Sequence, residues 1–102
     1  MPYGLNEKTL EDICGVFNLF PAIESAVLYG SRAKGNFKSG SDIDISLIGE
    51  EINLFMLNQV SMALENLNLP QQFDLSIRHQ IENKELLAHI ERNGIVFYLK
   101  KI

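Results

Sequence analysis

The chain has 102 residues, of which 46% are hydrophobic and 22% are charged. This size and balance predict one globular domain, residues 1–102, with a single hydrophobic core. The formal net charge of −4 argues against general nucleic-acid binding, because proteins usually contact a duplex through a clearly basic surface. Any contact with phosphate groups is therefore expected to be local.

Cys14 is the one cysteine of the chain, so an intramolecular disulfide cannot form. Its neighbours at helical spacing are apolar, which predicts a place in a buried stripe. Residues 1–12 lack the basic start and apolar run of a signal peptide, and no apolar run approaches the ~18 residues that span a bilayer. We therefore expect a cytoplasmic protein with no membrane partner.

A helix is predicted over residues 6–18, because apolar side chains recur there with a helical period and Asn6 suits the N-cap position. A strand is predicted over residues 24–30, and Gly30 marks a sharp turn at its end. The next strand is marked more clearly, because apolar residues alternate with acidic or hydroxyl residues over 42–49. One face of that strand is apolar and the other is acidic.

A long helix is predicted after Gly49, where apolar residues up to Leu67 keep a period of 3.6 residues. Glu50 and Glu51 are expected near its positive N-terminal end. The segment 71–77 alternates again and predicts a third strand, with a further aspartate on its polar face.

Asn83 suits the N-cap of a last helix that continues to Asn93, Gly94 suits the position after that helix, and residues 95–99 close the chain as a short strand. The order of elements is then α-β-β-α-β-α-β. It predicts an α+β fold with two layers, in which helices pack on one face of a small mixed sheet.

Three carboxylates are expected to converge on the polar face of this sheet. Side chains two residues apart on a strand point the same way, and a neighbouring strand lies about 4.8 Å away, so Asp74 joins Asp42 and Asp44 if their strands are adjacent. Like charges at that range repel by about 1 to 4 kcal/mol per close pair, which favours a bound cation. Hard oxygen ligands suit Mg²⁺ or Mn²⁺, and two such ions can neutralise a nucleoside triphosphate.

The loop before the acidic strand carries candidates for binding phosphate. Gly30 leaves room for backbone N–H groups to approach phosphate oxygens, and Ser31 offers a hydroxyl at the start of a helical turn. Arg32, Lys34 and Lys38 are the nearby cations, and the predicted binding set takes Arg32 and Lys34 together with Ser41, beside the acidic pair. A tight turn with solvated basic side chains is the alternative interpretation.

The spacing of these residues matches a known family. Gly30 and Ser31, ten intervening residues, and then Asp42, Ile43 and Asp44 fit the GS-x10-DxD signature of the nucleotidyltransferase superfamily, the polymerase-beta-like enzymes. Four fixed residues at this spacing arise by chance in roughly one in a thousand chains of this length. The chain resembles a minimal nucleotidyltransferase (MNT), the small form usually encoded beside a HEPN-domain protein, which implies the nucleotidyltransferase fold.

The resemblance also implies a role for each matching residue. In the family, the positions of Gly30 and Ser31 hold the triphosphate, and those of Asp42, Asp44 and Asp74 bind two magnesium ions. The last aspartate also acts as base toward the incoming hydroxyl. The implied reaction is transfer of AMP from ATP to a tyrosine of a HEPN toxin, which would make the chain an antitoxin in a hetero-oligomer.

Two other functions remain open. A small-molecule nucleotidyltransferase of the antibiotic-modifying kind would use the same carboxylates, but it is disfavoured because no acceptor domain follows Ile102. A module that masks a HEPN partner without chemistry would not need the carboxylates. The isolated aromatic residues Phe37, Phe55 and Tyr98 are candidates for docking a second protein.

Overall fold

The computed structural model describes residues 2–101. Its elements are η1 (Pro2–Gly4), α1 (Glu7–Asn18), β1 (Ser25–Tyr29), α2 (Ser31–Lys34), β2 (Ile43–Ile48), α3 (Leu54–Glu65), β3 (Phe73–Ile77), η2 (Arg78–Gln80), α4 (Lys84–Asn93) and β4 (Ile95–Leu99). Every long helix and strand predicted from the sequence is present, whereas the 3-10 turns η1 and η2 have no predicted counterpart. None of the helices described has the length and apolar character needed to cross a bilayer.

Four strands form one mixed sheet in the order β3-β2-β1-β4. β1 is antiparallel to its neighbours β2 and β4, whereas β2 and β3 are parallel. The chain reaches β3 from β2 through α3, because parallel neighbours need a crossover connection. The predicted α+β fold with a small mixed sheet is confirmed.

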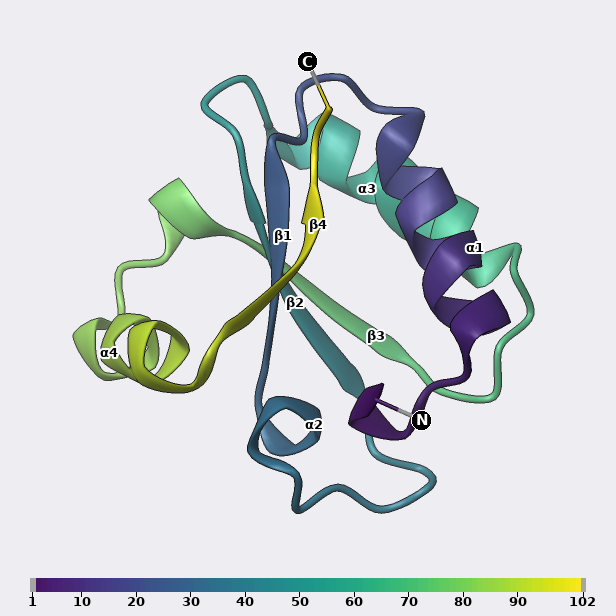
Figure 1. Ribbon diagram of the computed structural model, residues 1–102. Helices are drawn as coiled ribbons and strands as arrows, with labels where there is room; N and C mark the ends of the chain where they lie inside the picture. The colour runs from purple at the N-terminus through teal and green to yellow at the C-terminus, as the bar shows by residue number, and fades with distance from the viewer. Residues whose placement is uncertain (1, 102) are drawn as a thin grey trace.

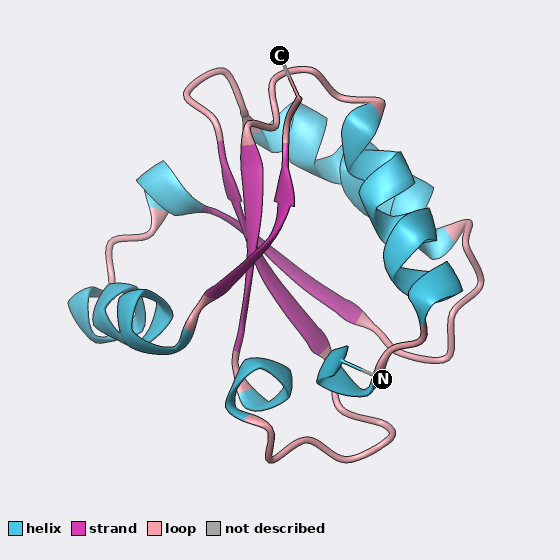
Figure 2. Ribbon diagram, in the orientation of Figure 1, coloured by secondary structure: helices cyan, strands magenta, loops and turns pink. Residues whose placement is uncertain are grey.

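Helices α1 and α3 cover one face of the sheet, on the right in Figure 1 and in cyan in Figure 2. Apolar side chains on that face of the strands pack against both helices and form the main core. Its buried members include Ile13 and Phe17 of α1, Leu28 of β1, Ile43, Ile45 and Leu47 of β2, and Val60 and Leu64 of α3. The apolar residues that recur at helical spacing in α1 and α3 thus pack against those that alternate along the strands.

Helix α4 lies on the opposite side of the sheet, on the left in Figure 1. Its Ile90 forms a second buried cluster with Val27 and Tyr29 of β1. The sequence predicted helices on one face alone, and the difference has a physical cause. Because Ala26 and Leu28 already fill the main core from β1, this strand is apolar on both faces and needs a second cover.

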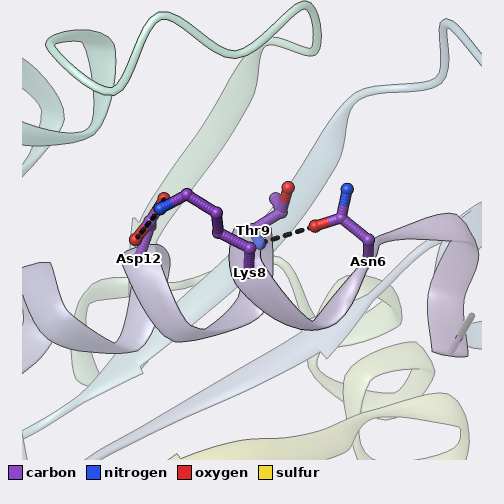
Figure 3. Close-up of polar contacts among 4 residues, drawn as sticks. All are labelled: Asn6, Lys8, Thr9 and Asp12. Atoms are coloured by element: carbon purple, nitrogen blue, oxygen red, sulfur yellow. Dashed lines mark hydrogen bonds and ion pairs between the residues drawn. The ribbon is translucent and has the colours of Figure 1, made fainter.

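Asparagine side chains begin the three longer helices α1, α3 and α4, as the sequence predicted for α1 and α4. The Oδ1 atom of Asn6 accepts a hydrogen bond from the backbone N–H of Thr9 at 2.8 Å (Figure 3). One turn further on, Lys8 and Asp12 form an exposed ion pair at 3.3 Å. Asn83 caps α4 through two backbone N–H groups in the same way.

Helix α3 begins later than the sequence predicted. Asn53 is its N-cap, and the Asn53 side chain accepts a hydrogen bond from the N–H of Met56 at 2.9 Å. Glu50 and Glu51 lie in the preceding turn, outside the helix. An asparagine that satisfies an early helical N–H group therefore sets this boundary, rather than the attraction of acidic side chains to the helix dipole.

The three aromatic residues predicted to face a partner differ in exposure. Phe55 is 73% exposed on α3, as expected. Tyr98 is instead buried edge-on against the ring of Phe17, and Phe37 is half-buried under the guanidinium group of Arg32. The prediction was wrong for Tyr98 and Phe37, because core packing and a cation–π contact occupy their rings.

Replacing Ile45 by alanine tests the main core. Ile45 is fully buried in the interior strand β2, so Ile45→Ala should lower the free energy of unfolding by about 2 to 5 kcal/mol through lost contacts and a residual cavity. Urea denaturation measures the change. Val96→Ala is the control, because this side chain is 58% exposed and its loss should change stability by about 0.5 kcal/mol or less. Equal losses in the two variants would contradict the packing described.

Candidate active site

Asp44 of β2 and Asp74 of β3 are direct partners in the parallel register. Their side chains therefore lie on the same face of the sheet, with the two backbones about 4.8 Å apart. Asp42 lies just before β2, close enough for its charge to act on Asp44. The three aspartates singled out in the sequence thus lie near one another at one end of this face, which is also the face that α4 covers in part.

Asp44 sits where its negative charge is unfavourable. Burial is the largest cause, followed by the charges of Asp74 and Asp42, and these effects raise the pKa of Asp44 to about 6. The positive charge of Arg32 opposes the rise without cancelling it. A cation placed against this carboxylate would favour its charged form.

Gly30 lies beside Asp44, at the turn from β1 into α2. Its φ of +75° belongs to the region that favours glycine. A Cβ atom at this position would also collide with Oδ2 of Asp44. Glycine therefore lets the Asp44 carboxylate approach the backbone at the point where α2 begins.

Ser31 opens the single turn of α2, which the bond from the N–H of Lys34 to the carbonyl of Gly30 closes at 3.1 Å. The N–H groups at the start of a helix have no acceptor within it and are available to an anion. The side chain of Lys34 is exposed at the end of this turn. Gly30 and Ser31 thus lie next to the carboxylates, and phosphate contact by these three residues stays a prediction.

Arg32 is placed differently from the sequence prediction. Its side chain is 2% exposed, and its guanidinium group donates to the backbone carbonyls of Tyr3 and Ser41, both at 2.8 Å. Burial lowers the pKa of Arg32, and the charge of Asp44 opposes that effect. The expected contact of Arg32 with phosphate is therefore corrected, because backbone carbonyls enclose its donors and hold it away from solvent.

Ser41 takes part in the loop that precedes Asp42. Its Oγ atom accepts a hydrogen bond from the backbone N–H of Lys38 at 2.8 Å, and its carbonyl accepts from Arg32. Both polar groups of Ser41 thus shape this loop. A contact between Ser41 and a nucleotide stays a prediction.

Tyr29 belongs to the same face, although the sequence did not single it out as a site residue. It is the antiparallel partner of Asp44, and its ring packs edge-on to that of His89 with the centroids 6.3 Å apart. Burial raises the pKa of Tyr29, the polar side chain of Ser76 lowers it, and the charges of Asp74 and Asp44 raise it further. The strand period indicates which face Tyr29 takes, but its place opposite Asp44 depends on the register.

The donor chemistry of this face fits divalent cations. Carboxylate oxygens are hard ligands that suit Mg²⁺ or Mn²⁺, and the pKa of Asp44 is raised by burial and then by the neighbouring charges of Asp74 and Asp42. Within residues 2–101, as the side chains stand, no three acidic, histidine or cysteine residues form a ready-made metal site. Binding of metal by Asp42, Asp44 and Asp74 stays a prediction.

A family model described as "Polymerase beta, Nucleotidyltransferase" matches residues 11–102. The chain belongs to this family. The matched region of the nucleotidyltransferase includes the GS-x10-DxD motif and Asp74. The family and enzyme class expected from the motif are thus confirmed.

Solved structures share the fold of this nucleotidyltransferase. A chain of a toxin-antitoxin crystal structure with AMP-PNP is 19% identical, with a TM-score of 0.71, and the match covers 95% of the present chain and 76% of that one. A chain from a structure of tri-AMPylated Shewanella oneidensis HEPN toxin in complex with MNT antitoxin is 14% identical, with a TM-score of 0.70 and coverages of 94% and 74%. A chain of a toxin-antitoxin MntA-HepT crystal structure is 14% identical, with a TM-score of 0.69 and coverages of 93% and 74%.

At these identities, the likeness shows a common fold. It is the nucleotidyltransferase fold that the motif implied. A comparison with curated proteins finds no match.

Replacing Asp44 by asparagine should stabilise the metal-free nucleotidyltransferase at pH 7.5. The folded-state pKa of Asp44, about 6, exceeds the unfolded value of about 3.9, so folding favours the protonated form and stability falls as pH rises between these values. Asp44→Asn removes that loss. Because Asp44 is partly exposed, we expect a gain on the order of 1 kcal/mol, discounted for solvent screening.

Urea denaturation with EDTA between pH 4 and pH 8 measures this effect, and the gain should shrink toward pH 4. Asp12→Asn is the control, because Asp12 lies in an exposed ion pair on α1 and its replacement should give no gain. A lower stability of Asp44→Asn at pH 7.5 would show that the Asp44 charge is favourable in the folded protein.

Replacing Gly30 by alanine should destabilise the protein and displace Asp44. The positive φ of Gly30 and the collision with Oδ2 of Asp44 act together, and we expect a loss of about 1 to 3 kcal/mol in unfolding free energy. Gly15→Ala is the matched control, because Gly15 lies in α1 with open space around it and should gain about 0.5 to 1 kcal/mol. A neutral Gly30→Ala in thermal denaturation would contradict the close approach.

Proposed function

We propose that this nucleotidyltransferase transfers AMP from ATP to a hydroxyl group of a HEPN toxin and thereby acts as its antitoxin. ATP is the proposed substrate and Mg²⁺ the proposed cofactor. The observation that carries the proposal is the pairing of Asp44 with Asp74 beside the turn at Gly30. The carboxylates proposed to bind metal thus lie next to the turn proposed to bind phosphate.

The total charge of the proposed site with its substrate favours two magnesium ions. Three aspartates and a triphosphate together carry about −7, which two Mg²⁺ reduce to about −3. Asp42, Asp44 and Asp74 would hold the ions, which supply charge neutralisation and lower the pKa of an attacking hydroxyl. This face, where burial and then the charges of Asp74 and Asp42 raise the pKa of Asp44, is suited to receive them.

Asp74 is the proposed base. It is exposed on β3, an edge strand of the sheet, so a hydroxyl from another protein can approach it without entering the core. The Asp74 carboxylate takes the hydroxyl proton while the acceptor oxygen bonds to the α-phosphorus of ATP and pyrophosphate leaves. The acceptor is proposed to be a tyrosine.

The start of α2 is the proposed place for the phosphates of ATP. Gly30 leaves the backbone open, and the Ser31 hydroxyl and the first N–H groups of the turn would donate to phosphate oxygens. Lys34, exposed at the end of the same turn, adds positive charge.

Proteins of similar fold support a partner of the HEPN class. One structure contains AMP-PNP, and another contains an AMPylated HEPN toxin. By likeness, the present chain forms a hetero-oligomer with a HEPN toxin encoded by a neighbouring gene. Phe55, exposed on α3, remains the candidate aromatic contact for this partner.

Mass spectrometry of the chain mixed with the HEPN protein from the neighbouring reading frame tests the transfer. With ATP and Mg²⁺, the partner should gain ~329 Da for each AMP. Asp74→Asn removes the proposed base and should slow the transfer by about 10² to 10⁴ fold. Asp12→Asn, the same change at an exposed position of α1, should leave the rate unaltered.

The alternatives predict other outcomes, which this experiment, a toxicity assay and the same reaction with an added antibiotic distinguish. A partner that gains no mass with Mg²⁺ or Mn²⁺ would refute the transfer. Suppression of toxicity that survives Asp42→Asn and Asp44→Asn together would select masking without chemistry. AMP found on an added antibiotic, with none on the partner, would select a small-molecule nucleotidyltransferase.

A further inference from the structure

Arg32 is a buried cation whose hydrogen bonds all go to backbone carbonyls. Its Nη1 atom donates to the carbonyl of Tyr3 at 2.8 Å, and Nη2 donates to those of Ser39 and Ser41 at 3.3 and 2.8 Å. Nε adds a second bond to Ser41 at 3.2 Å. One guanidinium group thus joins the N-terminal turn η1 to the loop that follows α2.

This arrangement uses properties that lysine lacks. The guanidinium group is planar and presents five donors in a fixed fork, so it can serve carbonyls on two segments at once. The guanidinium carbon Cζ lies over the ring of Phe37, 5.2 Å from the ring centroid. A buried charge is stable only when it is well bonded, and four hydrogen bonds and an aromatic ring meet that need here.

The N-terminal turn fits closely against this group. Gly4 has a φ of +72°, and a Cβ atom at Gly4 would meet the ring of Phe37 and Nη1 of Arg32. Tyr3, whose carbonyl accepts from Arg32, precedes it directly. Residues 3 and 4 therefore form one wall of the Arg32 site.

The bonds of Arg32 end next to a proposed metal ligand. Ser41, which accepts two of them, is followed by Asp42, and Asp42 lies outside the hydrogen-bonded strand β2. On the other side of Asp42, the N–H of Ile43 bonds to the carbonyl of Gln72 at 2.8 Å. The position of Asp42 is thus fixed by Arg32 before it and by the sheet after it.

We propose that Arg32 is a positioning residue: its buried guanidinium group holds the 35–41 loop against the N-terminal turn, so that Asp42 stands beside Asp44 for metal binding. The proposal rests on the metal site of the proposed function. Loss of an outer-shell contact of this kind weakens metal binding by about 10 to 100 fold.

Mn²⁺ binding in the presence of AMP-PNP, followed by the electron paramagnetic resonance signal of free Mn²⁺, tests the proposal without transfer activity. Arg32→Lys keeps the charge and loses the fork, and it should weaken Mn²⁺ binding by about tenfold or more. Arg78→Lys is the matched control, because Arg78 pairs with Glu91 at the far end of β3, and its Mn²⁺ affinity should equal that of the wild type. Thermal denaturation of each variant separates a loss of folding from a loss of metal affinity.

Gly4→Ala provides a second test that leaves Arg32 in place and decides the question if Arg32→Lys does not fold. It pushes the N-terminal turn away from Arg32 and Phe37, so it should weaken Mn²⁺ binding in the same direction. Folded variants with wild-type Mn²⁺ affinity would overturn the positioning role, even if their melting temperatures fall. Wild-type protein that binds no Mn²⁺ would instead refute the metal site of the proposed function.

Discussion

The concentration of negative charge at Asp44 is the constraint on which the site depends. Asp44 is partly buried between Asp42 and Asp74, and each close pair of like charges costs about 1 to 4 kcal/mol. The same strand buries Ile43, Ile45 and Leu47 on its other face, and each apolar side chain contributes about 1.5 to 3 kcal/mol. The free energy gained by burying the apolar face of β2 therefore exceeds the free energy lost to charge repulsion on its acidic face.

Strand register connects these two faces. A shift of one residue in β2 would turn Ile43 and Ile45 out of the main core and turn Asp44 into it, so the core fixes the pairing that places Asp44 beside Asp74. The antiparallel register with β1 also puts Tyr29 opposite Asp44 and leaves Gly30 at the strand end. The same apolar contacts thus set the core, the carboxylate pair and the turn into α2.

Local patterns in the sequence predicted much of this arrangement. The alternation of β2 and β3 predicted the shared face of Asp44 and Asp74, and the Asn6 cap was visible from helix-start chemistry. Helix α4 packs on the second face of the sheet because β1 is apolar on both faces. The sequence of α4 itself does not indicate which face it covers. The burial of Arg32 was hidden for a related reason, because its partners are backbone carbonyls and any residue type can supply a carbonyl.

The different positions of the basic residues explain why the carboxylates still need external cations. Arg32 is the cation whose charge acts on Asp44, yet its donors are used by the carbonyls of Tyr3, Ser39 and Ser41. Arg32 attracts the Asp44 carboxylate electrostatically, but the pKa of Asp44 stays at about 6. A divalent ion in direct contact with carboxylate oxygens acts at a much shorter range, and Coulomb energy grows as that distance falls. A buried arginine that shapes the loop and a separate ion that neutralises the charge are therefore compatible parts of one site.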